Sequence, residues 1–363
     1  MPVEIAYGFV GLQHLFNTRA SDVGVERINT ALVETAAEHN RMINTLMQEL
    51  VEDTDVAQEE YRLPNTSTLQ PIDENGIPRP RSAQGFYQVA FPIFGGGDAW
   101  GADRIASEMM TVQEINDLTV EIQNADADWN SRHIISALLT KTSWTFYDKI
   151  ASANSKRGLG DITIMPLANG DTVTYPIKGL PPATANHYTG QANAIDDSNN
   201  PFPGIYSTLT KYVSNGNNPV IVAYIAENLQ TAVEGLASFK EVTDTDIRVG
   251  SGNDELIKSI SLGFGDELLG KVGRVWVVLW RRMPSNYIIS HVRGRAPLAR
   301  RQIPVASRQG LFPEMYSPDG ARKEHRWLRF AGYAVRNRLA ALCHYVGNAT
   351  YQNPTDYTAP LAQ

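Results

Sequence analysis

The closest approach to a chemical motif in the sequence is a glycine and lysine run, Gly265-Asp266-Glu267-Leu268-Leu269-Gly270-Lys271-Val272. A phosphate-binding loop surrounds its ligand with backbone amides and a lysine, and it needs Ser or Thr directly after that lysine to hold magnesium. Val272 occupies this position, and a predicted strand follows where a helix is required. The run therefore does not predict nucleotide binding.

Histidine and cysteine could serve as metal ligands or nucleophiles, but their spacing does not favour either role. No two histidines have the i, i+4 spacing with a glutamate that is typical of zinc hydrolases, and the single cysteine cannot form a disulfide within the chain. The sequence also lacks the Gly-x-Ser-x-Gly and Gly-x-Gly-x-x-Gly patterns, although a triad of distant residues would leave no local pattern. We therefore expect no catalytic site, no cofactor and no metal. These residues are His14, His39, His133, His187, His291, His325, His344 and Cys343.

The charge is distributed unevenly along the chain, although the net charge is only −7. Residues 1–140 hold 21 Asp and Glu against 8 Arg, a net charge of −13, whereas residues 281–338 hold 12 Arg and 1 Lys against 3 Asp and Glu, a net charge of +10. The two segments are either two solvated faces or contact surfaces, on which basic residues meet another copy's acidic part or a polyanion. Arginine favours contacts, because its planar fork pairs with carboxylate or phosphate at two points. The candidate inter-subunit or DNA-facing residues are Arg293, Arg295, Arg300 and Arg301.

The composition is that of a globular chain. With 363 residues, 42% of them hydrophobic, it can form one to three globular parts. Its longest apolar stretches are much shorter than the roughly 20 residues that cross a bilayer, and the N-terminus lacks a signal-peptide pattern. We expect a protein that is neither membrane-embedded nor exported.

The first hundred residues predict a helix followed by an extended arm. A helix capped by Ser21 or Asp22 and continuing to about Leu50 has apolar residues at helical spacing, but little beside it in sequence to pack on. Residues 51–102 are rich in proline and contain the turn dipeptide Asn75-Gly76, which predicts a long β-hairpin held by a neighbouring subunit. The glycine run at 95–97 could cradle an anion, but we expect a hinge at the end of this arm. The expected loop contacts alternate as a strand does: Tyr87, Val89, Phe91 and Ile93.

A long helix is expected next. Residues 111–151 contain no proline or glycine and carry a continuous apolar stripe, which predicts a single helix roughly 60 Å long. The alternative is two stacked helices with a break near residues 126–130.

The rest of the chain predicts a mixture of strands and short helices. We expect a hairpin between residues 162–165 and 172–175, followed by a polar domain boundary at 179–203. The expected elements after it are a helix at 204–213, a strand at 219–226, a helix at 227–236, strands at 273–280 and 287–292, and sheet strands over 327–346.

This order of parts resembles the major capsid proteins of tailed bacteriophages, which have the Hong Kong 97-type capsid fold that encapsulin compartments also use. Two stretches add to the likeness. The first is Leu268-Leu269-Gly270, a strand, Met283-Pro284 and the strand beginning Tyr287-Ile288-Ile289, and the second is the closing stretch Ala334-Val335-Arg336-Asn337-Arg338-Leu339-Ala340-Ala341-Leu342. The likeness covers most of the chain, and the order of elements contributes more to it than any single residue.

The resemblance implies an α+β protein in four parts: an N-terminal arm (1–55), an extended loop (56–105), a peripheral domain (106–190 and 322–363) with a long spine helix, and an axial domain (191–321). It further implies hexamers and pentamers of this chain in an icosahedral shell around double-stranded DNA, assembled in the host cytoplasm as part of a virion. Its implied partners are other copies, a portal, a separate scaffolding protein, packaged DNA through non-specific contacts and, in some shells, a decoration protein. No membrane partner is implied.

Two departures from well-known members refine this expectation. Some members crosslink through a lysine in the extended loop, but the first lysine here is Lys141, so we expect a shell held without that covalent bond. Some members also carry a scaffolding segment before the arm. Because the arm and loop occupy the residues before the spine helix, we expect scaffolding to be a separate protein.

Three other functions compete with the phage shell. An encapsulin-like compartment would enclose a cargo enzyme, and a soluble α/β enzyme with a dispersed site would form a small oligomer. A sequence-independent DNA-binding protein using residues 281–338 would lose affinity steeply with salt.

Overall fold

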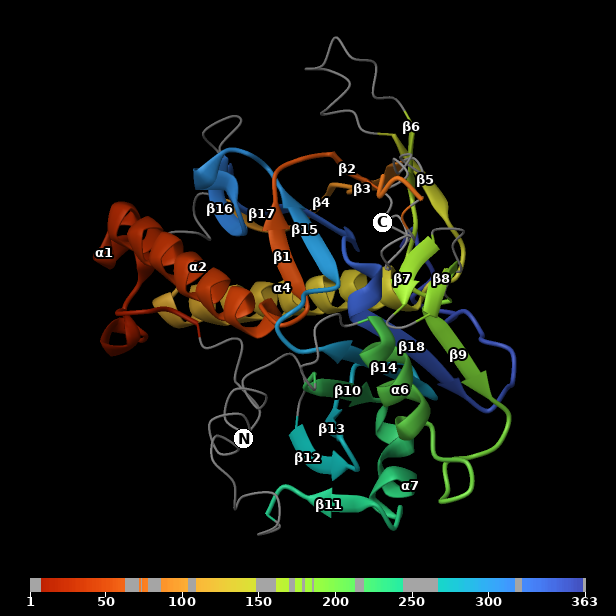
Figure 1. Ribbon diagram of the computed structural model, residues 1–363. Helices are drawn as coiled ribbons and strands as arrows, with labels where there is room; N and C mark the ends of the chain where they lie inside the picture. The colour runs from red at the N-terminus through yellow and green to blue at the C-terminus, as the bar shows by residue number, and fades with distance from the viewer. Residues whose placement is uncertain are drawn as a thin grey trace.

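The computed structural model describes residues 8–62, 72, 74–77, 86–103, 109–147, 161–169, 174–177, 180–184, 186–212, 219–243, 267–316 and 322–361. Within them a long helix, α4 (Val112–Leu139), lies between two large sheets of five and seven strands (Figure 1). Residues of the C-terminal half of α4, such as Ile134 and Leu138, are fully buried in a core cluster with residues of both sheets.

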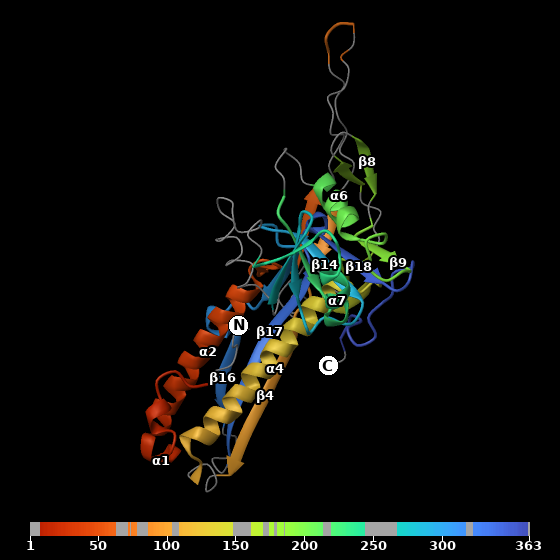
Figure 2. The same cartoon turned by 90° about the horizontal axis from the view of Figure 1, so that it is seen from below.

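The five-stranded sheet is organised around β17 (Arg322–Val335), which pairs with three other strands. Along one side it is antiparallel to β4 (Phe94–Asp103), and this pair runs beside α4 (Figure 2). Along its other side it is antiparallel to β16 (Leu311–Tyr316) and then to β15 (Leu298–Gln302). The short strand β1 (Val51–Thr54) adds to β15 in parallel.

The seven-stranded sheet has a central group of strands buried on both faces. Alternate residues of β10 face opposite clusters: Ile221 packs with α6 (Phe202–Tyr212), whereas Val222 is in the cluster containing α4. This explains why the strand reads as an unbroken apolar run. The strand order is β11 (Phe239–Glu241), β12 (Glu267–Val272), β13 (Val275–Leu279), β10 (Ile221–Ile225), β14 (Tyr287–Val292), β18 (Ala341–Val346) and β9 (Tyr188–Gln191).

The N-terminal helix differs from its prediction. It is interrupted at Gly24, whose φ of +91° separates α1 (Ala20–Val23) from α2 (Val25–Met47), and Ser21 lies inside α1 instead of capping it. A 3₁₀ turn, η1 (Gln13–Leu15), precedes them. The helix is also packed, since Ile28 and Leu32 share a buried cluster with Ile115 of α4. The expectation of an isolated arm helix is therefore wrong.

The helix α4 is continuous, so the two-helix alternative is wrong, but it is shorter than predicted. A capping box between Thr111 and Glu114 begins it, and Thr140 is already extended. Its 28 residues rise about 42 Å, at 1.5 Å per residue. The residues after it are β-formers that make β5 (Trp144–Tyr147), which explains why the absence of proline and glycine misled the prediction.

The short strands pair differently from the expected hairpin. β6 (Asp161–Ile164) is antiparallel to β5, and β7 (Thr174–Ile177) is antiparallel to β8 (Leu180–Thr184), so the described residues 162–164 and 174–175 do not pair with each other. β8 and β9 also occupy part of the segment expected to be a linker, 179–203.

The extended hairpin is confirmed at its base and turn. β2 (Gln58–Arg62) is antiparallel to β3 (Phe86–Ala90), and Gly76 lies in a turn with φ of +76°. The strand ends at Ala90, so Phe91 and Ile93 follow it instead of continuing it. The remainder of the arm, 63–71, 73 and 78–85, lies outside the described residues.

The expected glycine hinge at 95–97 is wrong, because these residues are paired strand residues of β4. A Cβ on Gly96 would lie 3.0 Å from Nε1 of Trp129, and one on Gly97 would lie 2.8 Å from Cδ2 of Leu328. The glycines therefore allow β4 to approach α4 and the neighbouring strand closely.

Most of the later elements are confirmed, including α6, β10, β13, β14 and the strands β17 and β18. The expected helix at 227–236 is a 3₁₀ turn, η2 (Glu227–Leu229), and a short α7 (Gln230–Glu234). Two further 3₁₀ turns are η3 (Ala306–Arg308) and η4 (Arg338–Ala340). Strand pairing crosses the expected domain limits, since β15 and β16 join β17, and β18 joins β14. The four-part division stays a prediction.

Candidate assembly surfaces and the arginine network

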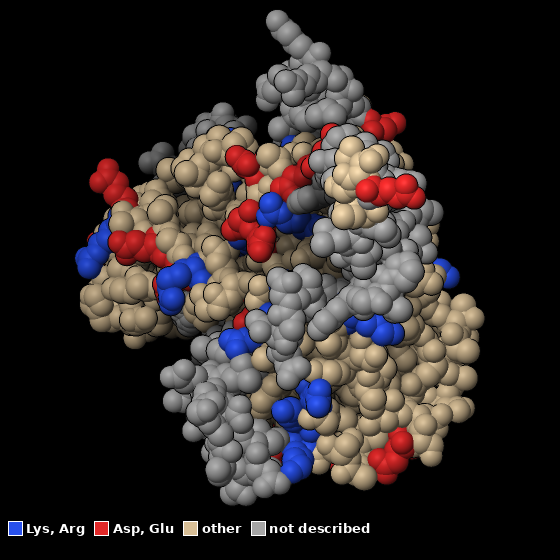
Figure 3. Space-filling view, in the orientation of Figure 1, with Lys and Arg blue, Asp and Glu red and all other residues tan. Residues whose placement is uncertain are grey.

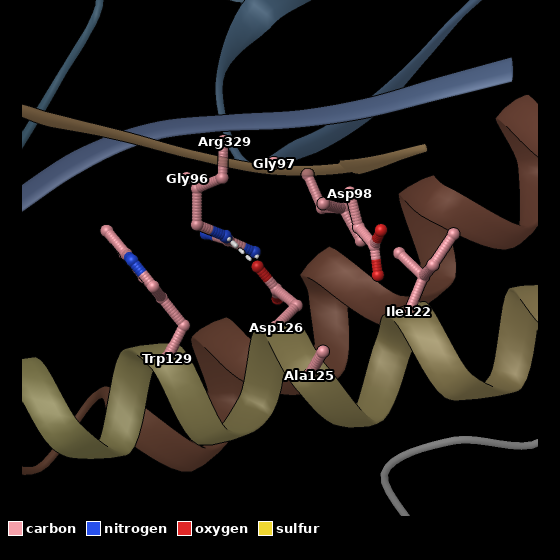
Figure 4. A pocket seen from close by; sticks show the side chains of 9 residues that line it. Gly96, Gly97, Asp98, Ile122, Ala125, Asp126, Trp129 and Arg329 are labelled. Atoms are coloured by element: carbon pink, nitrogen blue, oxygen red, sulfur yellow. Dashed lines mark hydrogen bonds and ion pairs between the residues drawn. The ribbon is translucent and has the colours of Figure 1, made fainter. Parts of the chain in front are cut away.

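A buried polar cluster joins the arm helix, the spine helix and the five-stranded sheet at the carboxylate of Asp126. Arg329 of β17 forks onto both carboxylate oxygens, with Nη2 at 2.8 Å from Oδ2 (Figure 4). His39 of α2 lies with Nε2 at 2.8 Å from Oδ2, and its side chain is fully buried. The same Arg329 donates to Asn40 Oδ1 at 3.0 Å. Three elements distant in sequence therefore meet at one carboxylate.

The electrostatic environment keeps Asp126 ionised. Burial by itself would raise the pKa of this carboxyl, but the charge of Arg329 and the hydrogen bonds from His39 and Arg329 together hold the pKa below its usual value. The cluster continues through Asn130, which donates to Asp126 Oδ2 at 3.2 Å and accepts from the Tyr333 hydroxyl at 2.6 Å.

Arg300, a predicted contact residue, is buried and paired within the chain. Its guanidinium forks onto Asp53 of β1, with Nε at 2.7 Å from Oδ1 and Nη2 at 2.9 Å from Oδ2. Nη2 also donates to Asn44 Oδ1 at 2.8 Å. Only 3% of its side chain is exposed, so the structure places Arg300 between the arm and the sheet, not on a free surface.

The other three predicted arginines are in different environments. Arg301 is also buried, and its Nη1 donates to the carbonyl oxygen of Phe91 at 3.2 Å. Arg293 is partly exposed and pairs with Glu49 Oε1 at 3.2 Å. Arg295 is exposed, and no ion pair of its guanidinium is found in the described part of the chain. A role towards DNA or another subunit stays a prediction for Arg293 and Arg295.

The acidic and basic segments noted in the sequence pair with each other inside one chain. Arg336 forks onto Glu59 of β2 at 3.1 and 3.0 Å, and its Nη1 donates to Glu52 of β1 at 2.9 Å. Figure 3 shows acidic and basic side chains lying side by side over the region of β1 and β15. Several charges that lie far apart in the sequence therefore form ion pairs within one chain. The pairs between the two segments are Glu49–Arg293, Glu52–Arg336, Asp53–Arg300, Glu59–Arg336, Asp126–Arg329 and Asp128–Arg282.

The predicted loop contacts are mostly buried in this chain. Val89 and Phe91 belong to a cluster with Ile162 and Ala299, and Ile93 is also buried. The backbone of Tyr87 is in β3, whereas its side chain lies outside the described residues. The described contacts of Val89, Phe91 and Ile93 therefore fix the base of the loop to its own chain, and a contact of Tyr87 with a neighbour stays a prediction.

A groove lies between β4 and α4. One hollow of about 150 Å³ is lined by Gly96, Gly97, Trp129 and Arg329 among others (Figure 4), and a larger one of about 510 Å³ also has Gly96, Gly97 and Trp129 in its wall. Because they share these residues, the two hollows adjoin.

Metal ligands and the glycine and lysine run at 265–272 were the chemical features considered in the sequence. No group of three or more His, Cys, Asp and Glu that could hold a metal ion is found among them. Lys271 lies inside the strand β12, whereas the lysine of a phosphate-binding loop lies at the start of a helix. Across the described ranges, no helix has the length and apolar character to cross a membrane.

Sequence reasoning missed the central residues of the buried cluster. Asp126 stood out only as part of a possible helix break, and His39 as one of seven scattered histidines. A signal existed, since Asp126 interrupts the apolar stripe of a helix on its buried side, where a charge requires a partner. The identity of that partner depends on tertiary structure.

Neither a protein-family model nor a curated protein matches the sequence. Among solved structures, a chain of Mycobacterium phage Patience is similar over 95% of both chains, with a TM-score of 0.67 and 16% identity. A chain from the asymmetric unit of the mature capsid of bacteriophage PhiM1 is similar over 83% of this chain and 86% of its own, with a TM-score of 0.51 and 10% identity.

The protein thus has the fold of a bacteriophage capsid subunit. This likeness confirms, for the overall fold, the Hong Kong 97-type capsid fold that the order of elements predicted. The finer division into peripheral and axial domains stays a prediction.

Proposed function

We propose that this chain is the major capsid protein of a tailed bacteriophage, and that it self-assembles as hexamers and pentamers into an icosahedral shell around double-stranded DNA. The observation that supports this most is the likeness in fold to a phage chain over 95% of both chains. A shared fold can serve several functions, so the proposal needs a test of assembly.

The architecture supports a shell subunit more than an enzyme. Its buried ion pairs, Asp53–Arg300 and Asp126–Arg329, join different elements of the fold. Buried side chains of this kind stabilise the fold and do not face a substrate. The extended hairpin has its base in β2 and β3, and its exposed turn residues 74–77 are suited to contacts with a neighbouring copy. Many modest contacts repeated by symmetry make such a closed shell stable.

The test is negative-stain electron microscopy of the purified protein, alone and with candidate scaffolding proteins. We expect closed shells of uniform size, or rings of five and six subunits. Nucleic acid inside particles from infected cells would agree with a virion, whereas an enclosed enzyme would indicate a compartment. A small oligomer that never assembles would overturn the proposal.

We also propose a portal, a separate scaffolding protein and, in the mature virion, DNA contacts as the partners of the shell, which would assemble in the host cytoplasm. Among the predicted DNA-facing arginines, Arg295 is the exposed one and Arg293 is partly exposed. Replacing Arg295 with glutamine should reduce the salt dependence of DNA binding by isolated subunits by about one unit of slope. An unchanged slope would remove Arg295 from the DNA-facing surface.

A further inference from the structure

The strand β4 is an edge strand. Ten of its residues pair with β17, and no second strand pairs with it in the described part of the chain. Long edge strands present unpaired amides and carbonyls that recruit other strands, so monomeric proteins usually protect them.

The opposite edge of this sheet is protected. The side chain of Asn40 in α2 donates to the Leu311 carbonyl at 2.8 Å and accepts from the Leu311 amide at 2.7 Å. β16 also contains Pro313, which has no amide hydrogen to offer. A strand cannot easily add to β16.

Among the described residues, β4 has no comparable protection. It contains no proline, lysine or arginine, and four of its ten residues are glycine. The amide of Ala99 donates to the carboxylate of the adjacent Asp98 at 2.7 Å, a local substitute for a strand partner. Because alternate residues of a strand present their amides to the same edge, Gly97 and Gly101 share the edge of Ala99.

The groove beside this edge could receive side chains. The larger hollow of about 510 Å³ lies between β4 and α4, where Trp129 and His133 provide aromatic surface. Arg132 is exposed at the same wall, and its guanidinium has no carboxylate partner among the described residues. Asp128 also lines this hollow, but its carboxylate pairs with Arg282 at 3.0 Å. The groove therefore fits an extended segment that carries an apolar side chain and an acidic one for Arg132.

We infer that the open edge of β4 is a docking site for an extended segment of a second copy of this chain, which adds as a strand and places an acidic side chain at Arg132. This inference rests on the proposed function, because a shell brings copies into repeated contact. The chain is itself a source of acidic segments, because it exposes acidic residues such as Asp55 and Glu60 besides the six in residues 1–140 that pair with its own basic segment. Strand addition supplies affinity through backbone hydrogen bonds and specificity through alternate side chains.

The first experiment compares the assembly of Ala99→Pro, Ala99→Ser and the unchanged chain. Proline removes the outward amide and obstructs an added strand, whereas serine keeps the amide at an exposed position. At equal protein concentration, we expect the Ala99→Pro variant to leave about ten times as much unassembled protein as the unchanged chain, or more. The Ala99→Ser variant should assemble like the unchanged chain. Thermal unfolding monitored by circular dichroism confirms that both variants fold. A folded Ala99→Pro that assembles like the unchanged chain would overturn the inference.

A second pair of variants covers the case in which Ala99→Pro fails to fold. Arg132→Glu reverses the charge at the groove, and Asn124→Glu introduces a glutamate at an exposed position of α4 that does not line it. We expect only Arg132→Glu to reduce assembly. Equal behaviour of the two variants would contradict the inference.

A photo-crosslinking residue at position 125, which is exposed and lines the hollow, identifies the occupant in shells mixed from ¹⁴N- and ¹⁵N-labelled chains. We expect mixed-isotope peptides, which come only from two copies. Crosslinks restricted to one isotope, or to a different protein, would overturn the second-copy assignment. If the unchanged chain forms no shells, the proposed function is wrong. If shells form and both Ala99→Pro and Arg132→Glu assemble normally, only the docking site is refuted.

Discussion

At the scale of single residues, the carboxylate of Asp126 fixes the relative positions of three elements. It accepts from Arg329 of β17 and lies against His39 of α2, while it belongs to α4 itself. Such a buried charge contributes to stability only while it is paired, since an unpaired one has lost its hydration without compensation. The sequence showed a carboxylate on the buried side of a helix, but it could not show which residues bind it. The partners His39 and Arg329 are 87 and 203 residues away along the chain.

Replacing Asp126 with asparagine should lower the free energy of unfolding by about 3–5 kcal/mol, because Arg329 would remain buried beside a neutral group. Urea unfolding of the unassembled chain measures the change. Asp128→Asn is the matched control on the same helix, because Asp128 pairs with Arg282 through a side chain that is 63% exposed, and its loss should cost about 1 kcal/mol or less. Equal, small losses for the two variants would show that the buried cluster does not stabilise the fold.

The same cluster predicts a pH dependence with a definite sign. The pKa of Asp126 is lowered from 3.8 in the folded chain, since the pairing that Arg329 and His39 provide outweighs the effect of burial. The unfolded chain therefore binds a proton more readily, and the stabilisation is complete above pH 3.8 and is lost as the pH falls below it. Urea unfolding between pH 6 and 3 should show a steeper loss for the unchanged chain than for Asp126→Asn. Parallel curves would contradict this assignment.

At the scale of elements, the glycines of β4 show why local reading of the sequence fails. Glycine populates turn conformations, so a run of three predicts a hinge, but here the run is an extended strand against Trp129 and Leu328. What selects glycine is the space beyond each Cα, and this depends on a helix and a strand that come later in the chain. The end of α4 was misjudged for a similar reason, since β5 is a strand only when β6 pairs with it.

Gly97→Ala should destabilise the chain by about 1–3 kcal/mol, because the added methyl would lie 2.8 Å from Leu328 Cδ2 and 3.0 Å from the Trp327 carbonyl oxygen. Gly204→Ala in α6 is the matched control, since a Cβ there meets nothing within 4 Å. This control should leave stability unchanged or slightly raised, because alanine favours helix. Thermal unfolding distinguishes the two. A neutral Gly97→Ala would mean that β4 can move away from its neighbours.

Arg338 anchors the segment that follows β6. Its guanidinium donates to the carbonyl oxygens of Met165, Pro166, Leu167 and Asn169 at 2.6–3.2 Å. Lysine cannot reproduce this planar set of donors, so Arg338→Lys should cost about 2–3 kcal/mol. Arg326→Lys, at a partly exposed pair with Glu324, is the control and should cost about 1 kcal/mol or less. Hydrogen exchange of residues 165–169 should increase only in Arg338→Lys, and protection equal to the unchanged chain would contradict the anchor.

At the scale of the whole molecule, the order of elements was predictable and their pairing was not. Amphipathic periodicity located α4, because burial of one face leaves a repeating pattern in the sequence, and an unbroken apolar run located β10, which is buried on both faces. The joining of β15 and β16 to β17, and of β18 to β14, arises from contacts between distant segments. The arginines of the predicted contact surface illustrate the same limit, since Arg300 and Arg301 are buried within the chain. Their abundance predicted contacts with another copy or a polyanion, and it could not reveal that Arg300 and Arg301 bind groups of their own chain.

Intramolecular pairing between the acidic and basic segments predicts that the base of the extended loop is held electrostatically. Arg336 forks onto Glu59 and also binds Glu52, so Arg336→Glu would place a third carboxylate beside these two. We expect faster hydrogen exchange in residues 51–62 and 86–90 and a loss of about 1 kcal/mol, which is modest because the side chain of Arg336 is 32% exposed. Adding Glu59→Arg to this variant should recover part of the loss, since the double variant restores an opposite pair. Additive losses in this cycle would mean that packing, not charge, fixes the loop to the body of the subunit.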